Sequence, residues 1–184
     1  MQTIDFGELS RLSDILDARK PYLELISGRK VRKVSGRMRH SRLQLEFAVR
    51  LHDWAADKGV VGIEWRFWLI PAGEERTSLV PDVAYLSNER FNRLEGDARE
   101  MPPFAPDIVV EIRSPGDRAS NVQRKIELYL AHGSALVIDV DPLTRTIALH
   151  DTSTMRVLRE GDRFEHAAAP GLTFDVRALF ASVE

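Results

Sequence analysis

Cysteine is absent from the 184 residues of the sequence. This absence excludes a disulfide scaffold, cysteine-based zinc sites, iron–sulfur ligation and catalysis by a thiol, and it suits a reducing compartment. The sequence also lacks a hydrophobic run of roughly 18 residues, the length that a membrane-spanning helix needs. Its first residues have neither the basic nor the apolar segment of a signal peptide. We therefore expect a cytoplasmic protein that does not enter a membrane.

A strong net charge of either sign is missing too, because 26 Lys and Arg residues nearly balance 28 Asp and Glu residues. One segment is an exception and holds only basic charges: Arg29, Lys30, Arg32, Lys33, Arg37, Arg39 and Arg42. Such a block can contact the phosphate groups of nucleic acid, or it can be the solvated surface of a hairpin and a helix start. Charge alone leaves both interpretations open.

Hydrophobic periodicity predicts helices and strands along the whole chain. Helices are expected over residues 6–19, 39–58, 89–94 and 117–131. Strands are expected over residues 22–26, 31–34, 60–70, 79–86, 107–113 and 135–140, followed by antiparallel strands between 145 and 165. The strand–helix–strand unit over 107–140 requires a right-handed parallel crossover. We therefore predict one α/β domain over residues 1–184, with a mixed β-sheet flanked by helices and extra antiparallel strands at the C-terminal end.

Two acidic residues occupy positions where a predicted strand is apolar. Asp82 follows Pro81 at the start of one strand, and Glu111 interrupts a buried hydrophobic run in another. Charged side chains are seldom buried unless they are paired or bind a metal, and carboxylates on adjacent strands suit a hard divalent cation. The alternatives are a structural ion pair for Glu111 and a turn for the Pro-Asp dipeptide.

Lys125 is a third candidate because it lies on the inward flank of a predicted helix. The apolar stripe of this helix contains Val122, Ile126 and Tyr129, and at 100° per residue Lys125 lies beside that stripe. The alkyl part of its side chain can lie along the helix so that the ammonium group reaches solvent. Alternatively, the ammonium group can reach over the strand ends toward the carboxylates. Both interpretations remain open.

Three weaker candidates complete the list. Glu64 lies between apolar neighbours in the predicted strand 60–70 and could hold a metal-bound water, or it could pair with Arg66. Glu24 in the first strand has a similar pair of interpretations. His40 lies among basic residues at a helix start, where it could contact a phosphate or merely neighbour the helix cap.

These residues belong to a larger ordered set of motifs. The set contains Pro81-Asp82, Val110-Glu111-Ile112-Arg113-Ser114-Pro115, Lys125 with Tyr129 and Gly133, and Val137-Ile138-Asp139-Val140-Asp141-Pro142. In this order it resembles the Uma-two family, restriction-endonuclease-like proteins within the PD-(D/E)XK nuclease superfamily. The resemblance extends from Tyr22-Leu23-Glu24-Leu25-Ile26-Ser27-Gly28, through His40, to Pro170-Gly171-Leu172, and it implies a restriction-endonuclease-like fold.

The resemblance also implies roles for individual residues. Asp82 and Glu111 would bind a metal together with the backbone carbonyl of Ile112, with Glu64 as a further candidate. The superfamily usually has a lysine two residues after the second acid, and here that position is Arg113. Arginine can stabilise negative charge but cannot act as a base, so Lys125 on the following helix is the second candidate for the catalytic cation.

The function implied is a Mg²⁺- or Mn²⁺-dependent DNA endonuclease that hydrolyses phosphodiester bonds. DNA would be contacted by Arg37, Arg39, His40 and Arg42. No nucleotide cofactor is expected, because the sequence has no Walker loop and no dinucleotide fingerprint. A homodimer is expected, since cutting a duplex needs two active sites and a two-fold interface supplies them.

Two other functions remain open at the level of the sequence. One is a catalytically silent nucleic-acid-binding module on the nuclease fold, because fold resemblance alone does not deliver activity. The other is a fold reused for protein association. The strand from Ile63 to Leu69 is aromatic on both faces, so Trp65, Phe67 and Trp68 could form an oligomer interface, or both faces of the strand could be covered within the same chain.

Overall fold

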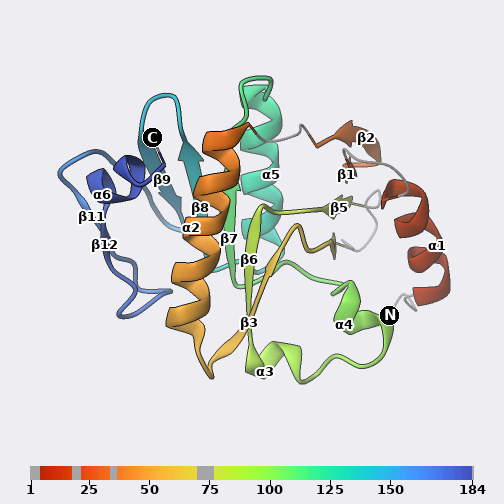
Figure 1. Ribbon diagram of the computed structural model, residues 1–184. Helices are drawn as coiled ribbons and strands as arrows, with labels where there is room; N and C mark the ends of the chain where they lie inside the picture. The colour runs from red at the N-terminus through yellow and green to blue at the C-terminus, as the bar shows by residue number, and fades with distance from the viewer. Residues whose placement is uncertain (1–4, 18–21, 34–36, 70–76, 184) are drawn as a thin grey trace.

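The computed structural model describes residues 5–17, 22–33, 37–69 and 77–183. Its centre is a six-stranded sheet in the order β10-β9-β8-β7-β6-β3 (Figure 1). Along the chain these strands are β3 (Gly59–Ile63), β6 (Val83–Ser87), β7 (Ile108–Ile112), β8 (Leu136–Asp141), β9 (Thr146–His150) and β10 (Met155–Leu158). Strands β7 and β8 are parallel and the other neighbouring pairs are antiparallel. The predicted mixed sheet is therefore confirmed, with β9 and β10 as the added antiparallel strands.

Helix α5 (Ala119–Ala131) connects β7 to β8 and completes the predicted crossover unit. Both strands are almost continuously apolar because the sheet is covered on its two faces. The sequence Ser114-Pro115-Gly116 ends β7, and Gly133 ends α5 with a φ of 100°, a conformation that glycine adopts without strain. Glu111 and Asp139 interrupt the apolar pattern of the two strands, and each meets a cation described below.

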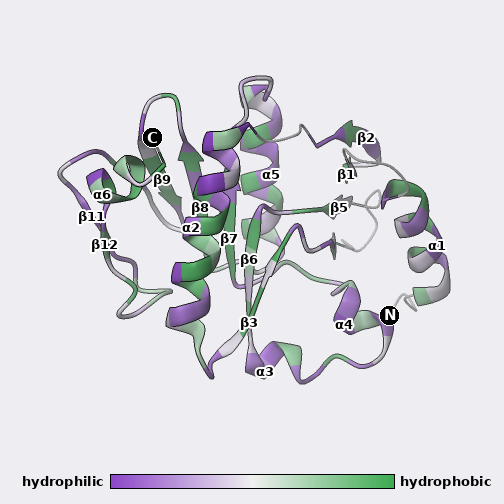
Figure 2. Cartoon of the chain, in the orientation of Figure 1, coloured by the Kyte–Doolittle hydropathy of each residue, from purple (hydrophilic) through white to green (hydrophobic). Residues whose placement is uncertain are grey.

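The two faces of the sheet have separate hydrophobic cores. Helices α2 (Met38–Ala55) and α6 (Val176–Ala181) cover one face and pack against Val110, Ile112 and Ile138. Helix α5 and a second sheet cover the other face, where they pack against Val109 and Val137. Figure 2 shows the consequence: the central strands are mostly hydrophobic, whereas the covering helices alternate hydrophobic and hydrophilic residues.

The second sheet has the strand order β2-β1-β5-β4. Its strands are β1 (Leu23–Ile26), β2 (Arg29–Arg32), β4 (Phe67–Leu69) and β5 (Thr77–Leu79). Helix α1 (Phe6–Asp17) packs on its outer side through Leu9 and Leu16. The remaining short elements are α3 (Asn88–Phe91), α4 (Asp97–Glu100), β11 (Arg163–Phe164) and β12 (Phe174–Asp175). No helix in the described ranges is long and apolar enough to cross a membrane.

The prediction of one continuous strand over 60–70 was wrong. The chain leaves the large sheet after β3, turns at Glu64 with a φ of 49°, and enters the small sheet as β4; residue 70 lies outside the described residues. The predicted strand over 79–86 is likewise divided between β5 and β6. Both divisions move the chain from one sheet to the other. The first lies two residues after Gly62, and the second contains Pro81.

Two of the three aromatic residues of this segment are core residues. Phe67 and Trp68 are fully buried within the two sides of the small sheet. Trp65 is half-buried and packs against Phe67 and Phe91, with ring centroids 4.8 and 6.3 Å away. For Phe67 and Trp68 the alternative of coverage within the same chain is therefore the correct one, because the second sheet and α1 cover them.

Candidate active site

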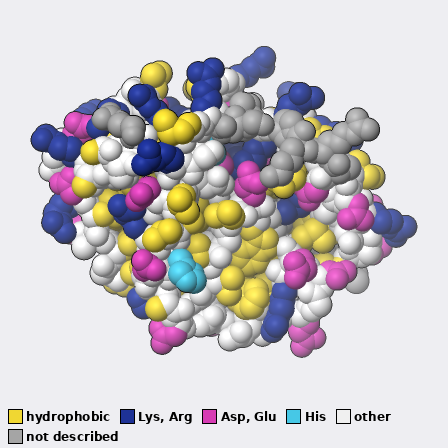
Figure 3. Space-filling model, in the orientation of Figure 1, with side chains coloured by type: hydrophobic (Ala, Val, Ile, Leu, Met, Phe, Trp, Pro, Cys, Tyr) yellow, Lys and Arg dark blue, Asp and Glu magenta, His cyan; other side chains and the backbone are white. Residues whose placement is uncertain are grey.

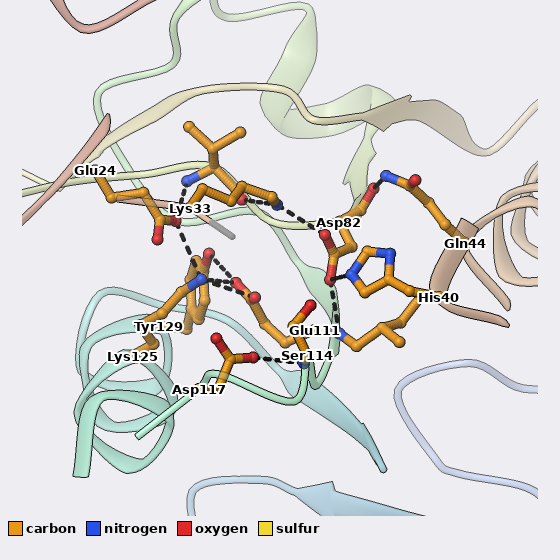
Figure 4. Close-up of polar contacts among 12 residues, drawn as sticks. Glu24, Lys33, His40, Gln44, Asp82, Glu111, Ser114, Asp117, Lys125 and Tyr129 are labelled. Carbon is orange, nitrogen blue, oxygen red and sulfur yellow. Dashed lines mark hydrogen bonds and ion pairs between the residues drawn. The ribbon is translucent and has the colours of Figure 1, made fainter. Parts of the chain in front are cut away.

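Asp82 and Glu111 meet at one end of adjacent strands. Strands β6 and β7 are antiparallel and pair Val83 with Val110. One further step along this register places Asp82 opposite Glu111, and directly opposed residues of an antiparallel pair point to the same face of a sheet. Both side chains line the same cavity, and Figure 4 shows the Glu111 carboxylate directed at Lys125 and Tyr129 and the Asp82 carboxylate directed at Lys33 and His40. The predicted juxtaposition of the two acids is present.

Glu111 is held by two side chains of helix α5. The Nζ of Lys125 donates to Glu111 Oε2 at 2.7 Å, and the Tyr129 hydroxyl donates to Oε1 at 2.8 Å (Figure 4). Lys125 and Tyr129 are four residues apart, so they lie on the same face of the helix. Lys125 therefore reaches the carboxylates rather than solvent.

Glu24 from β1 completes this side of the site. Its side chain is 4% exposed, its Oε1 accepts a hydrogen bond from the Val80 N–H at 2.8 Å, and the same oxygen lies 3.1 Å from the Nζ of Lys125. Lys125 is thus placed between two carboxylates that come from different sheets. The large sheet and the hairpin of the small sheet meet at this ammonium group.

Asp82 is surrounded by donors on its other side. Its Oδ2 accepts the backbone N–H of Ile112 at 2.7 Å and lies 3.3 Å from His40 Nε2. Its Oδ1 lies 2.8 Å from the Nζ of Lys33, although no described residue gives that oxygen a well-aligned hydrogen bond. Lys33 also donates to the carbonyl of Val80 at 2.6 Å.

These surroundings set the charge of each group. Burial opposes ionisation of Asp82, but Lys33 and His40 outweigh it and hold the pKa of Asp82 well below its usual range. Burial raises the pKa of Glu111 to about 7, although Lys125 and Lys33 act against the shift. Burial also opposes the charge of Lys125, but its two carboxylate partners outweigh it and raise the pKa of the ammonium group. Lys125 therefore keeps its proton at neutral pH, where it is a positive charge and a hydrogen-bond donor.

The side chains line a cavity with a volume of about 470 Å³. Lys30 and Arg32 from β2 and Arg118 from the loop before α5 also line it, and all three are exposed. Figure 3 shows Lys and Arg side chains gathered along the upper edge of the molecule, above α2, α5 and β2 as Figure 1 places them. The acidic interior of the cavity thus opens through a basic rim.

Arg113 does not point its charge at the carboxylates of the site. Its Nε donates to Asp139 Oδ1 at 2.9 Å, a second guanidinium nitrogen binds the other oxygen of Asp139, and Asp141 lies 3.8 Å away. Asp139 is buried in β8, so this bidentate pair compensates a buried charge. The prediction that Arg113 supplies the catalytic cation is not favoured by this geometry.

Of the other predicted residues, one lines the cavity and the others described here lie outside it. His40 lies in the site beside Asp82, whereas Glu64 lies in the turn between β3 and β4 and is not among the residues that line the cavity. Its suggested partner Arg66 pairs with Asp17 instead. Arg37 and Arg39 are exposed outside the cavity.

Arg42 is also outside the cavity, and its guanidinium group donates to the carbonyl of Ser182. From the basic block, the cavity is lined by three earlier residues: Lys30, Arg32 and Lys33. The part of the block that lines the cavity is therefore the hairpin strand and its end, and His40 joins it from the start of α2. Contact of DNA with Arg37, Arg39 and Arg42 stays a prediction.

The donor set suits a hard divalent cation. Three carboxylates face the cavity, from Glu24, Asp82 and Glu111, and Ile112 also lines it; oxygen ligands of this kind are those that Mg²⁺ prefers. Asp82 Oδ1 is a buried carboxylate oxygen without an aligned hydrogen-bond donor and is a candidate ligand atom, with the Lys33 Nζ 2.8 Å from it. As the described side chains stand, no three acidic or histidine groups are arranged to hold a metal. The Lys125 ammonium lies between Glu24 and Glu111, and the Lys33 ammonium lies against Asp82.

Comparison with known proteins supports the same fold. The family model Uma2, described as "Putative restriction endonuclease", matches residues 6–177. A crystal structure of "a putative nuclease belonging to DUF820" from Anabaena variabilis ATCC 29413 is similar with a TM-score of 0.83 and 23% sequence identity, and the match covers 99% of this chain and 100% of that chain. No curated protein matches the sequence. The predicted restriction-endonuclease-like fold is thereby confirmed.

Proposed function

The chain belongs to the Uma2 family of restriction-endonuclease-like proteins, and we propose that it is a metal-dependent nuclease that hydrolyses phosphodiester bonds in DNA. The observation that carries this proposal is the meeting of Asp82 and Glu111 from adjacent strands with Lys125 from α5. These are an acid pair for a divalent cation and a positive charge for the reacting phosphate, inside one cavity.

Each residue has a role that follows from its contacts. Asp82, Glu111 and the carbonyl of Ile112 would hold Mg²⁺ or Mn²⁺, and Glu24 would bind a metal-bound water. The cation would neutralise the charge of the phosphate and lower the pKa of the attacking water. Lys125 remains protonated, so it would donate a hydrogen bond to the attacking water or to a phosphate oxygen as negative charge develops.

Two supporting residues keep this arrangement in place. Tyr129 donates to Glu111 and thereby fixes the carboxylate that Lys125 also contacts. The Ile112 N–H does the same for Asp82 from the neighbouring strand. Groups that are held before the substrate arrives need no reorganisation during the reaction, which is the source of electrostatic catalysis.

DNA would approach across the basic rim of the cavity. Lys30, Arg32 and Arg118 can contact phosphates on either side of the scissile bond, since backbone contacts supply most of the affinity of a nuclease for DNA. Arg37 and Arg39 would extend this surface at the start of α2, where both are exposed. We further propose that the protein acts as a homodimer, which would bring two such cavities to one duplex.

The test is nicking of a supercoiled plasmid in Mg²⁺ and in Mn²⁺. We expect the wild-type protein to nick the plasmid, Glu111→Gln to lose the activity, and Lys125→Met to lower the rate by about 10²–10³-fold. Glu127→Gln is the matched control, because it makes the same substitution on the exposed side of α5. Equal nicking by wild type and Glu111→Gln would contradict the proposal, and DNA binding without cleavage in either metal would favour a catalytically silent binding module.

A further inference from the structure

Lys33 is a buried cation that lies at the metal side of the site. It follows the exposed strand β2, yet its side chain is only 11% exposed, whereas Arg29, Lys30 and Arg32 on that strand are exposed. A buried ammonium group is costly unless it is paired. Lys33 is compensated by an ion pair with the Asp82 carboxylate and a hydrogen bond to the Val80 carbonyl.

Lys33 lies beside the Asp82 oxygen that does not accept the Ile112 N–H. Asp82 Oδ2 is held by the Ile112 N–H, so Oδ1 is the oxygen that remains for a metal. The Lys33 ammonium lies 2.8 Å from that oxygen. A divalent cation bound there would therefore meet a positive charge within the same few ångströms, where the Coulomb repulsion in a buried site is large.

Of the two lysines, Lys33 is the one that can leave. Lys125 projects from the middle of α5 and contacts two carboxylates, Glu111 and Glu24. Among the residues that the structure describes, Lys33 contacts one carboxylate, that of Asp82, and it follows β2, which is an edge strand of the small sheet. An edge strand has hydrogen-bonded neighbours on one side only, so a movement at its end costs less than a movement of α5.

We propose that Lys33 is an internal competitor of the divalent cation: in the metal-free protein its ammonium group occupies the metal side of Asp82, and it is displaced toward the cavity when the metal binds. The proposal rests on the function proposed above. It assigns Lys33 the role of a residue that sets the metal affinity of the site, while Lys125 keeps the role toward the phosphate.

The test is calorimetric titration of the protein with Mn²⁺ alone, without DNA. Lys33→Gln retains a hydrogen-bond donor but removes the charge, so we expect it to bind Mn²⁺ at least about tenfold more tightly than the wild type. Arg29→Gln is the control, because it removes one positive charge from the exposed surface of the preceding strand, where solvent and salt screen it; we expect a change of less than about twofold. The melting temperature should rise more on addition of Mn²⁺ in Lys33→Gln than in the wild type.

Two other results would be decisive. Equal or weaker Mn²⁺ binding by Lys33→Gln, together with metal binding and nicking by the wild type, would overturn the role of Lys33 and leave the proposed nuclease function intact. Absence of Mn²⁺ binding in both proteins would overturn the metal site itself and the proposed function with it. Lys33→Met, a second neutral variant, gives the same comparison if Lys33→Gln does not fold.

Discussion

Asp82 and Glu111 lie opposite each other on adjacent strands, yet their surroundings move their pKa values in opposite directions. The pKa of Asp82 is lowered because Lys33 and His40 outweigh the effect of burial. The pKa of Glu111 is raised to about 7 because burial outweighs its cationic neighbours. In the metal-free protein, ionised Asp82 therefore stabilises the fold, whereas ionised Glu111 destabilises it.

The first prediction is that neutral substitutions of the two acids differ in stability. Asp82→Asn leaves the buried Lys33 ammonium without its counter-charge, and loss of one partner of a buried pair costs about 3 kcal/mol or more. Glu111→Gln removes a charge that burial disfavours, so the free energy of unfolding should be unchanged or higher. Urea unfolding of both variants in chelator measures the difference. Equal losses would show that Glu111 is also a structural ion-pair partner.

The second prediction concerns pH. Below the ordinary glutamate pKa of 4.5, Glu111 is protonated in both the folded and the unfolded state. Between 4.5 and about 7 the folded protein keeps a proton that the unfolded chain has released, so the free energy of unfolding falls as pH rises and becomes level above about 7. This fall should be smaller in Glu111→Gln. Urea unfolding at several pH values in chelator compares the two proteins, and identical pH profiles would contradict the assignment.

The third prediction separates Arg113 from Lys125. Arg113→Ala leaves Asp139 buried without its bidentate partner, and we expect a loss of about 2 kcal/mol; this value is below that of a fully buried pair because the Arg113 side chain is 41% exposed. The double variant Arg113→Ala/Asp139→Asn should lose less than the sum of the single losses. Additive losses in chemical unfolding would show that the two side chains do not stabilise each other.

Substitutions of Arg113 and Lys125 should also differ in their effect on nicking activity. Arg113→Lys retains a positive charge beside Asp139, so metal-dependent nicking should persist in the folded variant. Lys125→Met should lose most of it, as argued above. The opposite order of the two variants would return the catalytic cation to Arg113.

Asp82, Glu111 and Lys125 could be identified from the sequence because each breaks its local pattern. The two acids interrupt apolar strands, and Lys125 lies beside an apolar helical stripe. Lys33 could not be identified in this way. It belongs to a run of basic residues in which it looks like Arg32, and only the packing of the hairpin over Asp82 separates the buried lysine from its exposed neighbours.

The structural role of Arg113 does have a signal in the sequence. Asp139 is a charge in an otherwise apolar predicted strand, and β8 pairs it with Glu111, two residues before Arg113 on the neighbouring strand. The division of the strand over 60–70 has a weaker signal. The break falls at Glu64, two residues after Gly62, and it depends on the existence of a second sheet for β4 to join.

The fourth prediction concerns DNA binding at the rim. Lys30→Glu and Arg32→Glu should weaken binding of a DNA duplex and lower the slope of log affinity against log salt by about 1 for each phosphate that the variant no longer neutralises. Arg159→Glu makes the same charge reversal at an exposed position that does not line the cavity, so it should retain the wild-type slope. Fluorescence anisotropy over a series of salt concentrations measures all three, and equal slopes would assign the rim to solvent.

The last prediction concerns the proposed homodimer. With the aromatic strand buried, the described surface still exposes large hydrophobic side chains on α2: Met38, Leu45 and Val49 are 58, 63 and 48% exposed. Their spacing of seven and four residues places them on one face of the helix, and Figure 3 shows hydrophobic side chains in the middle of this view, over and beside α2. Contiguous exposed apolar surface favours association.

Light scattering at micromolar concentration should give a mass twice that of the chain, whose own mass is 20.9 kDa. Leu45→Lys should shift the protein toward the mass of the monomer. Met155→Lys, at an exposed position on β10 with 62% exposure, is the matched control and should remain dimeric. A monomeric wild type would contradict the dimer, and a dimer unaffected by Leu45→Lys would place its interface elsewhere than on α2.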